Sequence, residues 1–264
     1  MQRVPLYDAP VVAHVIRSGF VESVHHGSVV ALDADGSTLL AIGDIAGPIF
    51  PRSSSKPIQA LAMLRAGLGL DGELLAMAAA SHSGEQFHLE NVQRILARAG
   101  LTEQDLQNTP DLPYDETERT AWIAAGRPAT SLAQNCSGKH SAMLATCVAA
   151  GWDTATYRDP QHPLQQLMEQ TLAEVSGEPV AATGIDGCGA PVMAVSLTGL
   201  ARAFSRIAAA PAGTNEAKVA DAMRAFPECI GGTRRDVTAL MRGVPGLIAK
   251  DGAESVYAVG LADG

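Results

Sequence analysis

The stretch Arg52-Ser53-Ser54-Ser55-Lys56-Pro57 decides how this chain is interpreted, because it places a serine three residues before a lysine. Residues three apart on a helix share one face, with Cβ atoms roughly 5–6 Å apart. Pro57 is tolerated in a first helical turn, so a buried helix is predicted over residues 57–66. A serine hydroxyl is a poor nucleophile until a base removes its proton, and a desolvated lysine can be that base. The spacing therefore predicts Ser53 as nucleophile and Lys56 as base, although three serines before a helix also suit an N-cap.

The composition is typical of a folded protein that does not bind nucleic acid. Of the 264 residues 47% are apolar and 18% are charged, which is enough apolar surface for the core of one large domain. The net charge is −9 without a basic block, and aromatic residues make up only 4%, so nucleic acid is excluded as a partner. No run of 18 apolar residues occurs, so no membrane span is predicted.

The cysteines and the N-terminus predict a cytoplasmic protein. The four cysteines lie far apart in the sequence, which favours free or metal-bound thiols in a reducing compartment. Residues 1–10 lack a basic segment followed by an apolar core, so no secretion signal is expected. Cys147 and Cys229 fall in apolar helical contexts and are predicted to be core thiols.

Strands at both ends of the chain, with helices between them, predict an α+β fold in a single domain over residues 1–264. The predicted strands are 11–16, 28–32 and 38–42 at one end and 247–250 and 255–261 at the other, with one short strand over 180–185 between the helices. We expect these terminal strands to pair in one antiparallel sheet packed with helices. The same layout and the Ser-x-x-Lys spacing occur in serine β-lactamases and penicillin-binding proteins.

A second serine and a second lysine stand where chemistry is possible. Ser81 follows the apolar helix predicted over residues 74–80, and a hydroxyl at the end of a buried helix is well placed for a site. Lys250 ends an apolar strand and is the candidate base for Ser81. The simpler alternatives are a helix end that satisfies its own carbonyls and a solvated strand end.

Two glycine-containing loops each present one cysteine: Asn135-Cys136-Ser137-Gly138-Lys139-His140 and Asp186-Gly187-Cys188-Gly189. Cys136 and Cys188 are compatible with a disulfide, with two unrelated buried thiols, or with two ligands of a soft or borderline metal. Zinc prefers four ligands in a tetrahedron, with Cys sulfur at about 2.3 Å. Lys139 or His140 is then the third ligand, and histidine is the ordinary choice because a lysine ligand must be neutral.

Six segments, taken together and in order, resemble the asparaginase II family, the rhizobial-type L-asparaginases. They are Arg17-Ser18-Gly19-Phe20-Val21-Glu22-Ser23-Val24-His25, Arg52-Ser53-Ser54-Ser55-Lys56-Pro57, Ala80-Ser81-His82-Ser83-Gly84-Glu85, Asn135-Cys136-Ser137-Gly138-Lys139-His140, Thr183-Gly184-Ile185-Asp186-Gly187-Cys188-Gly189-Ala190-Pro191 and Leu247-Ile248-Ala249-Lys250. The resemblance implies hydrolysis of L-asparagine to L-aspartate and ammonia. It also implies a fold like glutaminases and serine β-lactamases, and a homodimer.

The resemblance assigns roles to residues one by one. Ser53 and Lys56 match the family's Ser-x-x-Lys pair, and Ser81 and Lys250 match its second Ser/Lys pair. The positions that hold a zinc ion in the family are matched by Cys136, Lys139 and Cys188, so the resemblance favours Lys139 over His140 as third ligand.

Binding of an α-amino acid requires a cation for its carboxylate and an anion for its amine. Arg52 and Asp186 are the expected pair, and His140 is placed close to the substrate beside them.

Two rival functions remain open at this point. One is a Ser/Lys amidohydrolase that acts on glutamine, a β-lactam or a peptide. The other is an inactive homologue whose Cys/Lys metal site is only structural. The second is raised because family members run on beyond Asp263-Gly264 through a further strand and helix, so this chain is expected to lack the family's C-terminal segment.

Overall fold

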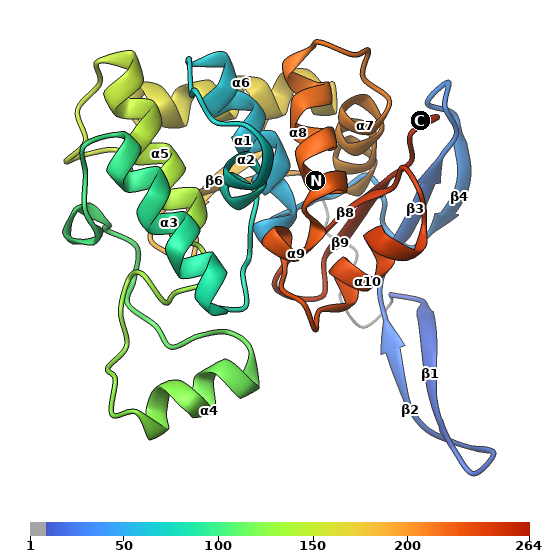
Figure 1. The fold of residues 1–264 in the computed structure, drawn as a ribbon. Helices are drawn as coiled ribbons and strands as arrows, with labels where there is room; N and C mark the ends of the chain where they lie inside the picture. Colours follow the sequence, from blue (N-terminus) through green and yellow to red (C-terminus); the bar gives the residue numbers. More distant parts are fainter. Residues whose placement is uncertain (1–8) are drawn as a thin grey trace.

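The structure is a computed structural model that describes residues 9–264, and it has the predicted α+β architecture (Figure 1). The helices are α1 (Lys56–Arg65), α2 (Gly72–Ala78), α3 (Gln86–Arg98), α4 (Glu116–Ala124), α5 (Ser137–Ala150), α6 (Pro163–Ser176), α7 (Leu197–Ala208), α8 (Asn215–Ala225), α9 (Pro227–Ile230) and α10 (Asp236–Gly243), with 3-10 turns η2 (Arg52–Ser55) and η3 (Glu103–Asp105). The strands are β1 (Val11–Arg17), β2 (Phe20–His26), β3 (Val29–Leu32), β4 (Thr38–Ile42), β5 (Pro48–Ile49), β6 (Ala182–Ile185), β7 (Pro191–Ser196), β8 (Ile248–Asp251) and β9 (Tyr257–Gly260). Most of the expectation about a secretion signal concerns residues 1–8, which lie outside the described range.

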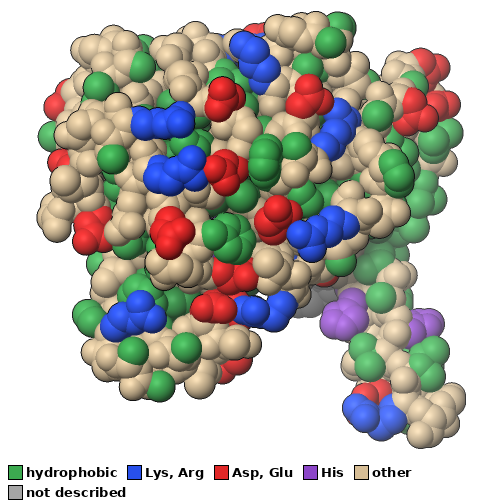
Figure 2. Space-filling model, viewed as in Figure 1, with side chains coloured by type: hydrophobic (Ala, Val, Ile, Leu, Met, Phe, Trp, Pro, Cys, Tyr) green, Lys and Arg blue, Asp and Glu red, His purple; other side chains and the backbone are tan. Residues whose placement is uncertain are grey.

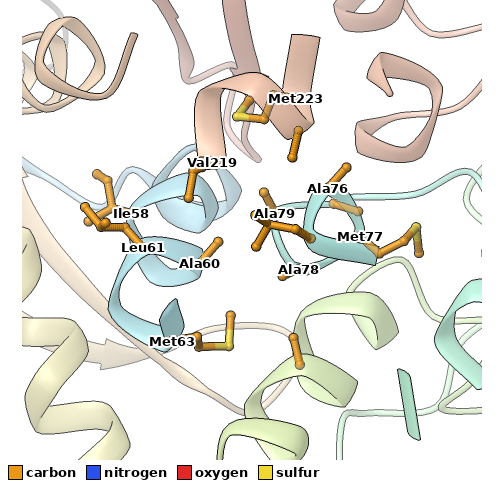
Figure 3. Close-up of a cluster of buried hydrophobic side chains, with 14 of the residues drawn as sticks. Ile58, Ala60, Leu61, Met63, Ala76, Met77, Ala78, Ala79, Val219 and Met223 are labelled. Carbon is orange, nitrogen blue, oxygen red and sulfur yellow. The ribbon is translucent and has the colours of Figure 1, made fainter. Parts of the chain in front are cut away.

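Helix α1 lies at the centre of the core because it is apolar on nearly every side. It packs against α2, α5, α6 and α8, and Leu61 and Met63 are completely buried. Figure 3 shows Ala60 of α1 on the side that faces the alanines at the end of α2, with Val219 and Met223 of α8 nearby, whereas Ile58 and Leu61 lie on the opposite side of α1.

The strands form small separate sheets, and the predicted pairing of the terminal strands in one sheet is wrong. In residues 9–264 the sheets are β1–β2, β3–β4, β5–β7–β6 and β8–β9, all antiparallel. The hairpins β3–β4 and β8–β9 both pack against α7 instead of sharing a ladder. Gly260 of β9 lies so close to α7 that a Cβ there would stand 2.6 Å from Phe204 O. The two hairpins therefore pack on helix α7 and do not form hydrogen bonds with each other.

Besides the two-residue β5, two longer strands were not predicted, for opposite reasons. Every residue of β7 is buried, so it lacks the polar alternation of a half-buried strand. Every residue of β2 is exposed, including the pair His25-His26. With β1 it forms an arm that projects from the body (Figures 1 and 2).

The described helices include none with both the length and the apolarity that crossing a bilayer requires.

Several distant segments meet at the start of α1. Ser54 of η2 donates from Oγ to Lys250 O at 3.1 Å, which ties the turn before α1 to strand β8. Ser81, three residues beyond α2, donates its backbone N–H to Ile230 O at 2.9 Å. The fold thus brings the predicted serines and lysines to one region.

Candidate active site

The amine of Lys56 lies at the centre of the site and is almost completely buried, with 1% of the residue exposed. Its Nζ donates to Ala80 O at 2.5 Å, to Ser81 Oγ at 3.0 Å and to Cys136 Sγ at 3.2 Å. An ammonium has three N–H donors, so these three acceptors account for all of them. A buried lysine is therefore satisfied without a carboxylate partner and touches both a hydroxyl and a thiol.

The three serines before Lys56 differ in what their hydroxyls do. Ser54 and Ser55 are buried and donate to backbone carbonyls, Ser55 to Arg52 O at 2.8 Å. Ser53 is half-buried, and within residues 9–264 its hydroxyl makes no hydrogen bond, including none to Lys56. Ser53 is thus the hydroxyl of this turn that a substrate can reach, but its predicted direct contact with Lys56 is not formed in this structure.

Ser81 and Lys250 do not form the predicted pair. Ser81 is 4% exposed and is bonded to Lys56. Lys250 is completely buried on β8, and its Nζ donates to Asp251 O at 2.6 Å and to Asp251 Oδ1 at 2.7 Å. The reason is local geometry, since a carboxylate on the next residue is nearer than a hydroxyl from another element. Burial lowers the pKa of Lys250 to about 8, with Lys56 adding to this effect and Asp251 opposing it.

The thiols of Cys136 and Cys188 pack against one another together with Ala190, and neither is in a disulfide. Lys139 Nζ donates to Cys188 Sγ at 3.3 Å, as Lys56 does to Cys136. The contact with the Cys188 thiol, supported by both lysines, lowers the pKa of Cys136 well below its ordinary value. That same contact, together with burial, raises the pKa of Cys188. The two sulfurs thus share negative charge beside the amines of Lys56 and Lys139. The remaining cysteines, Cys147 and Cys229, are buried in the core as predicted.

Arg52 and Asp186 form an ion pair beside Ser53, with Arg52 Nε donating to Asp186 Oδ1 at 2.7 Å. Partial burial raises the pKa of Asp186, but the hydrogen bonds from Arg52 and from Gly187 N outweigh it, so the net shift is downward. Arg52 has φ +52°, a left-handed conformation that costs a non-glycine residue of order 1–3 kcal/mol. The surrounding structure therefore imposes this backbone geometry next to Ser53.

His140 lies one residue beyond Lys139 but points into the protein. It is completely buried, and its Nδ1 is 2.7 Å from the hydroxyl of Tyr157. Its Nε2 is buried and has no partner among the described residues. Burial, followed by the charge of Lys139, lowers its pKa well below the ordinary value, so the ring is neutral.

Residues 13–264 match the family model described as L-asparaginase II. The chain belongs to the L-asparaginase II family. A comparison with curated proteins gave no match. The resemblance carried by the six sequence segments is thereby confirmed. At the level of the family, membership supports an asparagine amidohydrolase with an amino-acid substrate.

Lysines are few in this L-asparaginase II chain, and three of them are buried. It has only four, and Lys56, Lys139 and Lys250 are each at most 2% exposed, while Lys218 lies on the surface of α8. Fully buried lysines are rare unless they are paired. Each buried lysine here has its own partner. Lys56 bonds to Ser81 and Cys136, Lys139 bonds to Cys188, and Lys250 bonds to Asp251. A set of this kind is a feature of functional sites rather than of ordinary cores.

Two stacked histidines behind Ser81 were not predicted as site residues. His82 and His88 are completely buried, with ring centroids 5.1 Å apart. Ser137 Oγ donates to Leu132 O, so it accepts from His82 Nε2 at 2.8 Å; His88 Nε2 likewise faces Glu228 O at 2.9 Å. Both rings therefore carry their proton on Nε2, and neither buried Nδ1 has a partner among the described residues. Protonation would add a second donor with nothing to accept it, so both rings are neutral.

This pair predicts that the L-asparaginase II domain loses stability in mild acid. Burial lowers the pKa of His88 to about 4, against an ordinary value of 6.5, and lowers that of His82 well below 6.5. The unfolded chain binds these protons below about pH 6.5 and the folded chain does not, so folded stability is full above pH 6.5 and falls as the pH drops toward 4. For His88 the loss is on the order of 3 kcal/mol at full protonation.

Urea unfolding at pH 7.5, 6.5 and 5.5 measures the effect in a range where carboxylates contribute little. His88→Gln removes one titrating ring and is expected to flatten the dependence of the unfolding free energy on pH. An unfolding free energy that stays constant from pH 7.5 to 5.5 in the unaltered chain would contradict the neutral assignment.

Arg235 and Asp251 were also not predicted to belong to the site. Asp251 Oδ2 accepts from Arg235 NH2 at 2.5 Å, and Oδ1 accepts from Lys250. A carboxylate directly after the candidate lysine was the signal that could have been noticed.

Proposed function

We propose that this chain hydrolyses the side-chain amide of L-asparagine, giving L-aspartate and ammonia, by acyl transfer through a Ser/Lys site. Support comes chiefly from one observation: the buried Lys56 amine stands three residues from the accessible Ser53 and in contact with Ser81. Family membership favours asparagine as substrate. The Arg52–Asp186 pair supplies a cation and an anion for the α-carboxylate and α-amine of an amino acid.

In the proposed reaction, Ser53 Oγ attacks the amide carbon, and Lys56, in its neutral amine form, takes the Ser53 proton. The backbone amide of Ser54 is already bonded to Pro51 O at 3.0 Å, so we assign the developing oxyanion to the amide of Ser53 itself. Lys56 then returns the proton to the nitrogen, ammonia leaves, and an ester between Ser53 and the aspartyl group remains. Water attacks this ester and releases aspartate, with Ser81 and Lys250 in the proton relay.

The choice of nucleophile is tested by trapping the acyl ester and detecting it by mass spectrometry. Ser53→Ala is expected to abolish the adduct, whereas Ser81→Ala is expected to slow its formation because Lys56 loses its oriented partner. Ser55→Ala serves as the matched control, since among the described residues the Ser55 hydroxyl bonds to Arg52 O and to the Gln59 side chain and to no other site residue. An adduct that persists without Ser53 and disappears without Ser81 assigns the attack to Ser81 instead.

Substrate profiling separates the rival activities. Ammonia release from L-asparagine, L-glutamine and short peptides is compared with hydrolysis of a β-lactam under the same conditions. Preference for asparagine supports the proposal. No ammonia from any of these amides means that this 264-residue chain is a homologue without the activity. The homodimer and the cytoplasmic location stay predictions of the sequence.

We also propose that Cys136, Cys188 and Lys139 hold a zinc ion. The donor chemistry fits, because two adjacent thiols that share negative charge suit a borderline metal, and Lys139 is already at one of them. Among the described residues no three His, Cys, Asp or Glu side chains gather as a metal cluster, so a third protein ligand must be the lysine amine. Burial lowers the pKa of Lys139, yet the sulfur charges raise it overall, so a bound metal must displace its proton. Zinc would supply Lewis-acid polarisation near the substrate or would fix the two loops.

Metal analysis of the purified chain tests this site. About one zinc per chain is expected, with loss in Cys136→Ala and in Cys188→Ala because each removes a thiolate ligand. Cys147→Ala is the matched control, as Cys147 is a buried cysteine on the same helix outside the site. Zinc content that is unaffected by loss of Cys136 and Cys188 would place the metal elsewhere.

A further inference from the structure

Lys250, Asp251 and Arg235 form a chain of three charged groups, and the proposed reaction gives a role only to Lys250. Both of the hydrogen bonds that Lys250 Nζ makes go to Asp251, at 2.6 Å to its carbonyl and 2.7 Å to Oδ1. The other carboxylate oxygen of Asp251 accepts from Arg235 NH2 at 2.5 Å. Asp251 therefore bridges the lysine of β8 to the arginine that precedes α10.

We propose that Asp251 and Arg235 are positioning residues that fix the place and the protonation state of Lys250. The inference deepens the proposed function, because it concerns a lysine to which that function gives a relay role. Asp251 acts as the counter-ion that keeps a buried ammonium in place. Arg235 competes for the same carboxylate and so limits how strongly Asp251 favours that ammonium.

The charged groups that face Lys250 differ in whether they favour or oppose its ammonium form. Asp251 on the same strand is the anion, while Lys56 from α1 and Arg235 from the start of α10 are cations. The neighbouring elements add Tyr257 on β9, whose pKa is raised by burial and lies at about 12, and Arg224 on α8, which is bonded to Gly246 O. Tyr257 and Arg224 are not among the charges that shift the pKa of Lys250, which depends on Asp251, Lys56 and Arg235.

Two substitutions are therefore expected to move the titration of Lys250 in opposite directions. Asp251→Asn removes the anion but keeps the shape of the side chain, so the buried ammonium loses its partner and its pKa falls. Arg235→Gln removes a cation and leaves the carboxylate to Lys250 alone, so the pKa rises. A merely structural role for either residue would not produce shifts of opposite sign.

The presence of only four lysines makes a direct measurement practical. Protein labelled with ¹³C at the lysine Cε position gives one NMR signal per lysine, and each signal is followed against pH. Lys250→Met assigns the Lys250 signal, and surface-exposed Lys218 serves as an internal reference. We expect a midpoint near pH 8 in the unaltered chain, a decrease of roughly one unit or more in Asp251→Asn and an increase in Arg235→Gln.

Two further variants keep the test decisive. Asp251→Glu retains the carboxylate and is expected to restore a midpoint near that of the unaltered chain. Arg242→Gln changes an exposed arginine on α10 that is bonded to Glu228, and it is expected to leave the midpoint unchanged. Shifts of the same sign in Asp251→Asn and Arg235→Gln, or no shift in either, overturn the proposal.

The titration needs no turnover, so it is independent of whether the chain hydrolyses asparagine. If it does, the alkaline limb of the pH profile of kcat should follow the NMR midpoint through the variants. Opposite NMR shifts in a chain that releases no ammonia would support the positioning role and refute the enzymatic one. If the chain releases ammonia but the Lys250 midpoint does not move in the variants, the enzymatic role is supported and the positioning role is refuted.

Discussion

Replacing Lys56 with methionine is expected to lower kcat for asparagine hydrolysis by about 10²–10⁴-fold, the range typical for loss of a general base. Methionine has a similar length and is apolar, so it fills the buried space that the Lys56 side chain occupies. It removes the donors to Ala80 O, Ser81 Oγ and Cys136 Sγ at once. The reacting hydroxyl then has no base, and the Ser81 hydroxyl has lost the amine that orients it.

Ammonia release measures kcat, and circular dichroism with thermal unfolding shows whether the variant is folded. Lys218→Met is the matched control, because it is the same substitution at the lysine outside the site, on the exposed face of α8. A folded Lys56→Met protein that keeps more than a tenth of the activity would show that Lys56 is not the base. The mechanism would then have to use another group in the site.

Substituting Gly138 with alanine is expected to destabilise the protein by roughly 1–3 kcal/mol or more, the usual cost of overpacking a core. Gly138 lies in α5 where this helix crosses α2, and a Cβ there would stand 2.4 Å from Met77 O. A backbone carbonyl cannot rotate away as a side-chain end can, so the two helices must separate. The same change in an unhindered helix would add stability, by about 0.5–1 kcal/mol, so the sign of the effect is diagnostic.

Separating α5 from α2 would also disturb the candidate active site. Met77 lies four residues before Ser81, and Gly138 lies between Cys136 and Lys139, so moving α5 away from α2 pulls the thiol loop from the serine loop. Urea unfolding gives the free energy, and kcat is expected to fall together with it. The control is Gly243→Ala at the end of α10, where an added Cβ meets nothing within 4 Å. Equal unfolding free energies for Gly138→Ala and the unaltered chain would show that the helices accommodate the methyl group.

Local sequence pattern was enough to predict the elements that build the core. The apolar runs after Pro57 and before Ser81 correspond to α1 and α2, and both helices are buried as their composition required. The family was also evident from the sequence, because several short polar segments occurred in the family's order. Each of these features depends on neighbours in the chain, which is the information that a single sequence contains.

Which strands pair with one another was harder to predict from the sequence. The strands of hairpins β3–β4 and β8–β9 were predicted, but the prediction that they share a sheet failed because α7 packs against both hairpins. Strand β7 was missed because it is buried on both faces and therefore has no alternation to detect.

The sequence by itself determined which chemical groups this protein has for its site: two serines, three lysines and two cysteines, set in glycine-containing loops and at the ends of predicted helices and strands. Only the tertiary structure decided their partners, giving Lys56 to Ser81 and Cys136, and Lys250 to Asp251. The physical reason is that helical spacing specifies which residues share a face, whereas a long flexible amine with three donors bonds to whichever acceptors folding brings within about 3 Å. For Lys56 those acceptors come from 24, 25 and 80 residues further along the chain, beyond the reach of any local pattern.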